Sequence, residues 1–368
     1  MRAHPRRRPV GRVLLLFAAL ALPLSLGQAP APAAALAPPP TAAPSVAPVG
    51  PVLDQDFPDP DIVKAGRTYH AYATHGSTQN IQHATSADLT HWKADGGDVL
   101  PELGAWALPK RDLVWAPEVY DNGDGYTMHY TAHDRASDKQ CVGVALSDSP
   151  DGPFRPVGDG PLICPAAQGG AIDASSHTEG GQRYVLWKND GNCCGLDTWL
   201  YLQPTSWDGT RVTGEPVPLV KRDQEWEGPL VEAPTLVRRG GRHVLFYSAH
   251  FYRGDQYLTA YAVAEKLTGP YVKTSAPLMT TGGFSGAVRG PGGQDVVTGP
   301  DGRDRIVFHG WNADYTQRAM YLAGLSFEGG RPVVGGIEVP SRPSSTAADA
   351  WVADVADVAD NRRGHPQR

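Results

Sequence analysis

The chain has 368 residues, a formal net charge of −6 at pH 7 and only 8% aromatic residues. An acidic balance without a basic stripe argues against nucleic acid or an anionic membrane as the partner. The length would permit two domains, but all-β folds of this size often form a single unit.

The N-terminal region predicts export. Residues 1–37 combine five arginines with an apolar run and a small-residue segment, which is typical of a cleaved signal peptide. An uncleaved membrane anchor is the alternative, although the apolar run is shorter than a spanning helix requires. Cleavage after Ala37 would leave a mature chain of charge −11. We therefore expect a secreted, extracellular and monomeric protein.

Composition divides the remaining chain into three parts. Residues 38–50 are a Pro/Ala-rich linker, which cannot pack a core. Residues 51–341 hold the alternating apolar runs of a folded domain. Residues 342–368 are polar and rich in Ala and Asp, and we expect them to be disordered.

Five similar strand-like runs recur between Gly-, Asn- and Asp-rich turns. Taking the second residue of each run as a marker gives spacings of 57, 58, 59 and 63 for Tyr69, Tyr126, Tyr184, His243 and Ile306. This period suits the four-stranded blades of a β-propeller. The sequence therefore predicts an all-β, five-bladed β-propeller with its active site in the central channel. A β-sandwich with accidental spacing is the alternative.

One strand position in each repeat carries an acid or an aromatic residue. About eleven residues before the marker stand Asp59, Trp115, Asp173, Glu232 and Asp295. Acids within apolar strands are costly to bury unless they are paired or used chemically. This register predicts that acidic side chains converge on the channel and form a site there.

Four segments in order resemble the motifs of glycoside hydrolase family 43. They are Phe57-Pro58-Asp59-Pro60-Asp61-Ile62, Trp115-Ala116-Pro117-Glu118, Ala171-Ile172-Asp173-Ala174-Ser175 and Val231-Glu232-Ala233-Pro234. The resemblance implies an inverting enzyme that acts on arabinose- or xylose-containing plant polysaccharides. It makes Asp59 the general base, Glu232 the general acid, and Asp173 the group that orients Glu232 and raises its pKa.

The resemblance also suggests residues that bind the sugar or an ion. Trp115, Arg318, Asp295 and His309 are the candidate substrate contacts. Trp115 could instead be core, Arg318 could only pair with an acid, and His309 could be a satisfied buried histidine. No cofactor is implied, but a bound calcium or other ion near His309 is compatible with the family. In one departure, this chain has Gly293 where many members carry His.

Specificity and disulfide pairing stay open at this level. We favour an exo-acting α-L-arabinofuranosidase, with an endo-1,5-α-L-arabinanase, a β-xylosidase and a non-catalytic carbohydrate-binding propeller as alternatives. Four cysteines allow three pairings and fit an oxidising compartment. Cys193 and Cys194 either each bond a distant cysteine or bond one another, which would leave Cys141 with Cys164.

Overall fold

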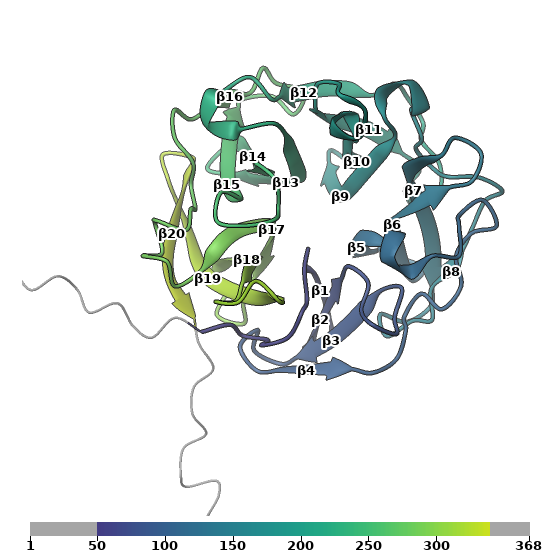
Figure 1. The fold of residues 1–368 in the computed structure, drawn as a ribbon, viewed down its shortest axis with the longest axis horizontal. Coiled ribbons are helices and arrows are strands. Elements are labelled where there is room, and N and C mark those ends of the chain that lie inside the picture. The colour runs from purple at the N-terminus through teal and green to yellow at the C-terminus, as the bar shows by residue number, and fades with distance from the viewer. Residues whose placement is uncertain (1–49, 339–368) are drawn as a thin grey trace, which may run out of the picture. The chain divides into compact units, whose positions relative to one another are not determined.

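The computed structural model describes residues 50–338. The predicted signal peptide, all but the last residue of the predicted linker, and the predicted tail lie outside the described residues. Within them, twenty strands form five four-stranded sheets arranged around a centre, which confirms the five-bladed propeller (Figure 1). None of the helices in residues 50–338 is long and apolar enough to cross a membrane.

Each blade is an antiparallel meander whose four strands follow chain order. Blades 1 and 2 comprise β1 (Asp61–Ala65), β2 (Thr68–Ala73), β3 (Gln82–Ser86) and β4 (Trp92–Asp95), then β5 (Trp115–Asp121), β6 (Tyr126–Asp134), β7 (Lys139–Ser147) and β8 (Arg155–Pro156). Blade 3 comprises β9 (Ala171–Glu179), β10 (Gln182–Asn189), β11 (Trp199–Thr205) and β12 (Val217–Lys221). Blades 4 and 5 comprise β13 (Val231–Arg239), β14 (Arg242–Ala249), β15 (Leu258–Ala264) and β16 (Val272–Lys273), then β17 (Arg289–Thr298), β18 (Asp304–Trp311), β19 (Arg318–Glu328) and β20 (Arg331–Glu338).

Four short 3₁₀ helices lie in loops: η1 (Arg111–Leu113), η2 (Ala166–Gln168), η3 (Gly191–Cys194) and η4 (Glu225–Glu227). The tightest hairpins use paired glycines. Gly180 and Gly181 join β9 to β10 with φ of 61° and 76°. Such two-residue hairpins require positive φ at both positions, which glycine adopts at little cost.

The first strand of every blade lies next to the centre, so β1, β5, β9, β13 and β17 surround the channel (Figure 1). Apolar side chains from the outer strands pack between neighbouring blades. Tyr72 of blade 1, for example, is in one buried cluster with Met128 and Phe154 of blade 2. The hydrophobic core therefore consists of separate clusters between neighbouring blades, and polar side chains line the channel.

The segment before β1 closes the ring against blade 5. Leu53 forms an antiparallel bridge with Met320 of β19, and the N–H of Phe57 donates to the carbonyl of Arg318 at 2.9 Å. The N–H of Arg318 in turn donates to Asp56 Oδ1 at 2.7 Å. These bonds hold the segment Leu53–Phe57 beside blade 5.

Candidate active site

Each blade has a residue in the left-handed backbone region at a matching place in or just before its innermost strand. These residues are Asp59, Ala116, Asp173, Ala233 and Gly293, with φ between 39° and 58°. Where they lie inside a strand, the pairing register shifts beside them, as in a β-bulge. Bulges redirect side chains and are frequent next to active sites. Here they turn the ends of the inner strands so that Asp59, Asp173 and Glu232 face a common space.

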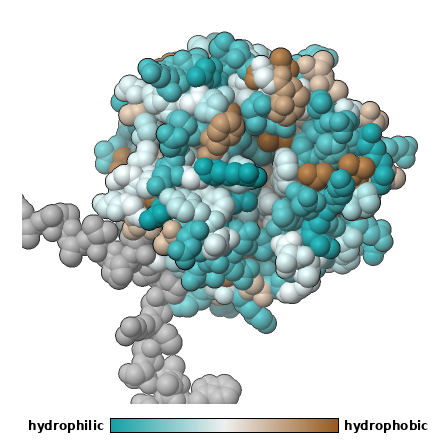
Figure 2. All heavy atoms as spheres, in the orientation of Figure 1, coloured by the Kyte–Doolittle hydropathy of each residue, from teal (hydrophilic) through white to brown (hydrophobic). Residues whose placement is uncertain are grey.

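That space is a cavity of about 610 Å³. Asp59, Asp173 and Glu232 all line it, together with Trp115 and Arg318. Aromatic and basic side chains of the loop Phe251–Arg253 form another part of its wall. Seen in the orientation of Figure 1, the surface is mostly hydrophilic and is hollowed near the centre of the ring (Figure 2).

Asp59 is held by three other elements. Thr74 Oγ1 donates to Asp59 Oδ2 at 2.7 Å, and Arg318 Nη1 lies 3.7 Å from the same oxygen. The backbone N–H of Asp59 donates to His309 Nδ1 at 3.0 Å. Because that nitrogen accepts, His309 is neutral with its proton on Nε2. Burial lowers the pKa of His309 to about 3, despite the opposing charge of Asp59.

Gly293 is required where it stands. A Cβ atom there would lie 2.6 Å from His309 Nδ1 and 2.7 Å from Asp59 Oδ1. A larger side chain at this place, such as histidine, would therefore collide with both side chains. In this chain, the glycine leaves the room in which His309 meets Asp59.

Glu232 is fixed through both carboxyl oxygens. Tyr257 donates to Oε1 at 2.9 Å, and Lys188 Nζ donates to Oε2 at 3.2 Å. Lys188 is fully buried and also donates to Asp190 and Asn192. Burial alone would lower the pKa of Lys188, but the charges of Glu232, Asp190 and Asp173 outweigh it and raise the pKa. Lys188 therefore stays protonated and supplies a permanent positive charge beside Glu232.

The charges of both Glu232 and Asp59 act on the carboxyl group of Asp173. Burial, together with the nearby charge of Glu232, raises the pKa of Asp173 well above its usual range, although Lys188 opposes the effect. Its Oδ2 accepts the N–H of Ala233, the residue after Glu232, at 2.9 Å. Asp173 thus positions the backbone next to Glu232, and its raised pKa favours its neutral form.

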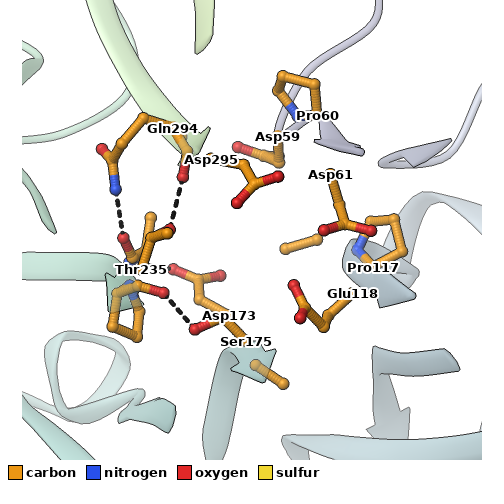
Figure 3. A pocket seen from close by; sticks show the side chains of 15 residues that line it. Asp59, Pro60, Asp61, Pro117, Glu118, Asp173, Ser175, Thr235, Gln294 and Asp295 are labelled. Atoms are coloured by element: carbon orange, nitrogen blue, oxygen red, sulfur yellow. Dashed lines mark hydrogen bonds between the residues drawn. The ribbon is translucent and has the colours of Figure 1, made fainter. Parts of the chain in front are cut away.

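A second layer of side chains lies two residues after each left-handed residue. Its members are Asp61, Glu118, Ser175, Thr235 and Asp295, and they surround a narrow space of about 40 Å³ (Figure 3). Each one bonds the backbone of the following blade. Asp61 accepts from Val119, Glu118 from Ser176 and Asp295 from Ile62, while Ser175 donates to Pro234 and Thr235 to Gln294. We call this five-link circle the channel ring.

The channel ring corrects the interpretation of Asp295. It does not line the cavity that contains Asp59 and Glu232, and its carboxyl group accepts the N–H of Ile62 at 3.2 Å. The prediction that Asp295 contacts sugar is therefore not supported by its position. Asp295 stands eleven residues before its marker Ile306, the same offset that Asp173 and Glu232 have from their markers. This offset was misleading because the left-handed residue of blade 5 is Gly293, two residues before Asp295.

The other predicted contacts divide into two groups. Trp115 and Arg318 line the cavity, and Arg318 packs over the rings of Tyr252 and Trp311. His309 is fully buried, so it supports Asp59 from behind and does not reach the cavity.

Lys188, Tyr257 and Thr74 were missed by sequence reasoning. Only Lys188 gave a signal, as a charge at the end of the apolar run Val185-Leu186-Trp187.

The structure pairs Cys193 with Cys194 and Cys141 with Cys164. The neighbouring pair lies in η3, next to Asn192, which accepts from Lys188.

Among residues 50–338, two groups of three side chains could ligate a metal, and neither contains His309. The Nε2 atom of His309 has no hydrogen-bond partner in this part of the chain. A calcium or other ion at His309 stays a prediction.

A propeller that presents several carboxyl groups in one cavity has the arrangement by which glycoside hydrolases act. Residues 49–332 match the model of glycosyl hydrolases family 43, and the chain belongs to this family of glycoside hydrolases. It is 29% identical over 172 residues to the extracellular endo-α-(1→5)-L-arabinanase of Thermotoga petrophila, covering 41% of this chain and 34% of that relative. It is 26% identical over 286 residues to extracellular endo-α-(1→5)-L-arabinanase 1 of Bacillus subtilis, covering 70% and 80%. The solved structure of a thermostable family-43 glycoside hydrolase superposes with a TM-score of 0.69 at 27% identity, covering 81% of this chain and 98% of that one.

Proposed function

We propose that this chain is a secreted, inverting hydrolase of α-1,5-linked arabinan, with Asp59 as general base and Glu232 as general acid. The observation that carries the proposal is that Asp59 and Glu232 line one cavity from blades 1 and 4, each held by its own hydrogen-bond partners. The printed names of the curated relatives support arabinan as the substrate and the extracellular space as the location.

The proposed mechanism is a single displacement. Glu232 protonates the leaving oxygen while Asp59 removes a proton from a water that attacks the anomeric carbon from the opposite side. Each of these roles typically accelerates a reaction about 10² to 10⁴-fold. Asp173 positions the backbone beside Glu232, and its own pKa is raised because burial and the nearby charge of Glu232 oppose a second negative charge there.

The remaining cavity residues would bind the sugar. Trp115 offers an aromatic face, and Arg318 offers guanidinium N–H groups beside Asp59. Placing a sugar hydroxyl between Arg318 and Asp59 would orient the anomeric carbon toward the base. These two side chains are our proposed substrate contacts, and His309 is a positioning residue for Asp59.

The position at which the enzyme cleaves the polysaccharide, within the chain or at its end, is a separate part of the proposal. Both relatives named above are endo-acting by name, so we propose endo cleavage in place of the exo-acting α-L-arabinofuranosidase favoured from the sequence. The competing functions are exo-arabinofuranosidase, β-xylosidase and carbohydrate binding without catalysis. Each predicts a different product or none.

Product analysis on a defined substrate panel tests the function. Linear α-1,5-arabinan, arabinoxylan, aryl α-L-arabinofuranoside and aryl β-D-xyloside should be incubated with the enzyme and the products separated by chromatography. Endo action predicts arabino-oligosaccharides of several lengths from linear arabinan at early times. Arabinose alone would indicate exo action, and xylose would indicate a xylosidase.

Two glutamate variants separate catalysis from binding. Glu232→Gln should abolish arabinan cleavage, whereas Glu102→Gln, at an exposed surface position, should retain wild-type rates. Equal activity of the wild type and Glu232→Gln would refute Glu232 as the acid. Arabinan binding without any product from the wild type would identify a non-catalytic propeller.

A further inference from the structure

Two buried histidines and an aspartate meet at the joint between blades 1 and 2, away from the catalytic cavity. His70 lies on β2, His83 on β3, and Asp151 in the turn between β7 and β8. His70 Nδ1 lies 3.1 Å from His83 Nε2 and 3.4 Å from Asp151 Oδ1. The three ligating atoms all lie within 4.8 Å of one another. None of these residues has a part in the proposed mechanism.

These separations match the ligand spacing of a tetrahedral zinc ion. With Zn–N distances of about 2.0–2.1 Å, neighbouring ligand atoms of a tetrahedron lie about 3.3 Å apart. Imidazole nitrogens and a carboxylate oxygen are ligands that Zn²⁺ accepts. The ring centroids are 5.3 Å apart, so the two imidazoles meet edge to edge through their nitrogens. An ion would replace the proton that these nitrogens otherwise share, and each ring would have to turn until its nitrogen lone pair points at the ion.

The burial and the neighbours of the two histidines would support a bound metal ion. Both imidazoles are at most 5% exposed, whereas the side chain of Asp151 is 62% exposed, which leaves the fourth position open to water. The second nitrogen of His83, Nδ1, is buried without a hydrogen-bond partner among residues 50–338, and the carboxylate of Asp95 lies 3.7 Å from it. A carboxylate facing the non-ligating nitrogen is the usual outer partner of a metal-bound histidine.

The turn that carries Asp151 is itself anchored. Tyr72, two residues after His70 and paired with His83 across the strands, donates from its hydroxyl to the carbonyl of Pro150 at 2.5 Å. This bond brings the neighbouring Asp151 of blade 2 to His70 of blade 1. We propose that His70, His83 and Asp151 bind a divalent transition-metal ion, Zn²⁺ foremost, which fastens blade 1 to blade 2.

Competing zinc ligands are few in the described chain. The other group of three, formed by Asp134, Cys141 and Cys164, has both cysteines in a disulfide, so no thiolate is available there. The described residues contain no free cysteine. No thiolate of these residues competes for zinc, and variants of His83 and Asp151 decide whether the ion binds at the histidine site.

Calorimetry and thermal unfolding test the proposal. After dialysis against EDTA and then metal-free buffer, the untagged protein should bind one Zn²⁺ with a Kd of about 10 μM or tighter at pH 7.5, and binding should weaken as the pH falls because protons compete with the ion for the imidazole nitrogens. Zinc at 100 times Kd should raise Tm by about 5 °C or more. Co²⁺ should give the visible absorption of a tetrahedral nitrogen and oxygen site.

Three variants locate the ion. His83→Gln and Asp151→Asn should each weaken zinc binding at least tenfold and remove the Tm rise, while Asp148→Asn, exposed in the same turn, should behave like the wild type. Asp151 is mainly exposed, so its variant should fold even if His83→Gln does not. No saturable zinc binding below about 1 mM, or unchanged binding in Asp151→Asn, would overturn the proposal.

Discussion

The ammonium group of Lys188 lies 3.2 Å from Oε2 of Glu232, and none of the lysine side chain is exposed to solvent. The proposed general acid therefore works beside a buried, permanent positive charge that comes from the neighbouring blade. This charge offsets the negative charge that Glu232 and Asp173 carry together. The cavity can thus concentrate carboxyl groups without an unbalanced buried charge.

Replacing Lys188 should change both stability and pH dependence. Lys188→Met leaves Glu232 and Asp173 without their counter-charge, and breaking a buried ion pair typically costs about 3–5 kcal/mol. Loss of the positive charge favours the protonated carboxyl forms, so the alkaline limb of the pH–rate profile should move to higher pH. Lys110→Met, at an exposed position, is the control. An unmoved alkaline limb would show that Lys188 has only a structural role.

The stereochemistry of the first product tests the assignment of base and acid. An inverting pair has carboxyl groups about 6.5–9.5 Å apart, which leaves room for the attacking water. Proton NMR of early product should show the anomeric configuration opposite to that of the substrate. Retention would mean that Asp59 acts as a nucleophile.

Leaving-group dependence separates the two carboxyl roles. Glu232→Ala should slow substrates with poor leaving groups far more than aryl glycosides with good ones, because good leaving groups need little protonation. Asp59→Ala should slow both kinds about equally, since the water still needs a base. If both variants show the same dependence, the assignment of separate roles is wrong.

Gly293 should not tolerate a side chain. Gly293→Ala places a Cβ atom against His309 and Asp59 at a residue with φ of 58°. We expect kcat/KM to fall at least tenfold, because Asp59 must shift from its hydrogen-bonded position. Gly324→Ala, where a Cβ atom meets nothing within 4 Å, should leave activity unchanged. A fully active Gly293→Ala would show that Asp59 needs no such fixed position.

The channel ring should make the protein less stable in alkali. Burial raises the pKa of Asp295 to about 8, with a further contribution from Glu118. The folded chain therefore holds this proton between about pH 4 and 8 while the unfolded chain has lost it, so this group lowers stability as pH rises through that window. Asp295→Asn lacks the titration and can still accept from Ile62.

Thermal unfolding from pH 5 to pH 9 measures this effect. The Tm of Asp295→Asn relative to the wild type should increase with pH and be about 2–4 °C higher or more at pH 9, the shift that about 1 kcal/mol gives for a domain of this size. Asp124→Asn, at an exposed position, should give a constant difference. A constant difference for Asp295→Asn as well would contradict the raised pKa.

The blades could be predicted from sequence because their signals are local. Alternating apolar residues and paired glycines such as Gly180 and Gly181 specify strands and hairpins within about sixty residues, and the markers repeat them five times. The placement of Asp59, Asp173 and Glu232 in one cavity followed from that register. Their chemical roles rest on the family resemblance and on the proposed mechanism.

The remaining features of the site depend on contacts between blades or on backbone strain. Ala116 and Ala233 adopt left-handed conformations that no alanine signals in a sequence. Lys188 meets Glu232 only because β10 and β13 are brought together by packing. Asp295 had the same spacing as the proposed catalytic acids, but two residues of bulge geometry placed it in a different layer.

The bonds between the segment around Leu53 and Met320 of β19 have a consequence for inactivation. Asp59 stands six residues after Leu53, and Arg318 stands two before Met320, so the proposed base and its arginine lie on opposite sides of the joint where the circle closes. His309 approaches Asp59 from the same last blade. Fraying of this joint would separate Asp59 from Arg318 and His309 while the other four blades kept their strands. Catalytic failure can therefore precede any large loss of β-structure, because the segment around Leu53 stabilises the position of the proposed base as well as the ring of blades.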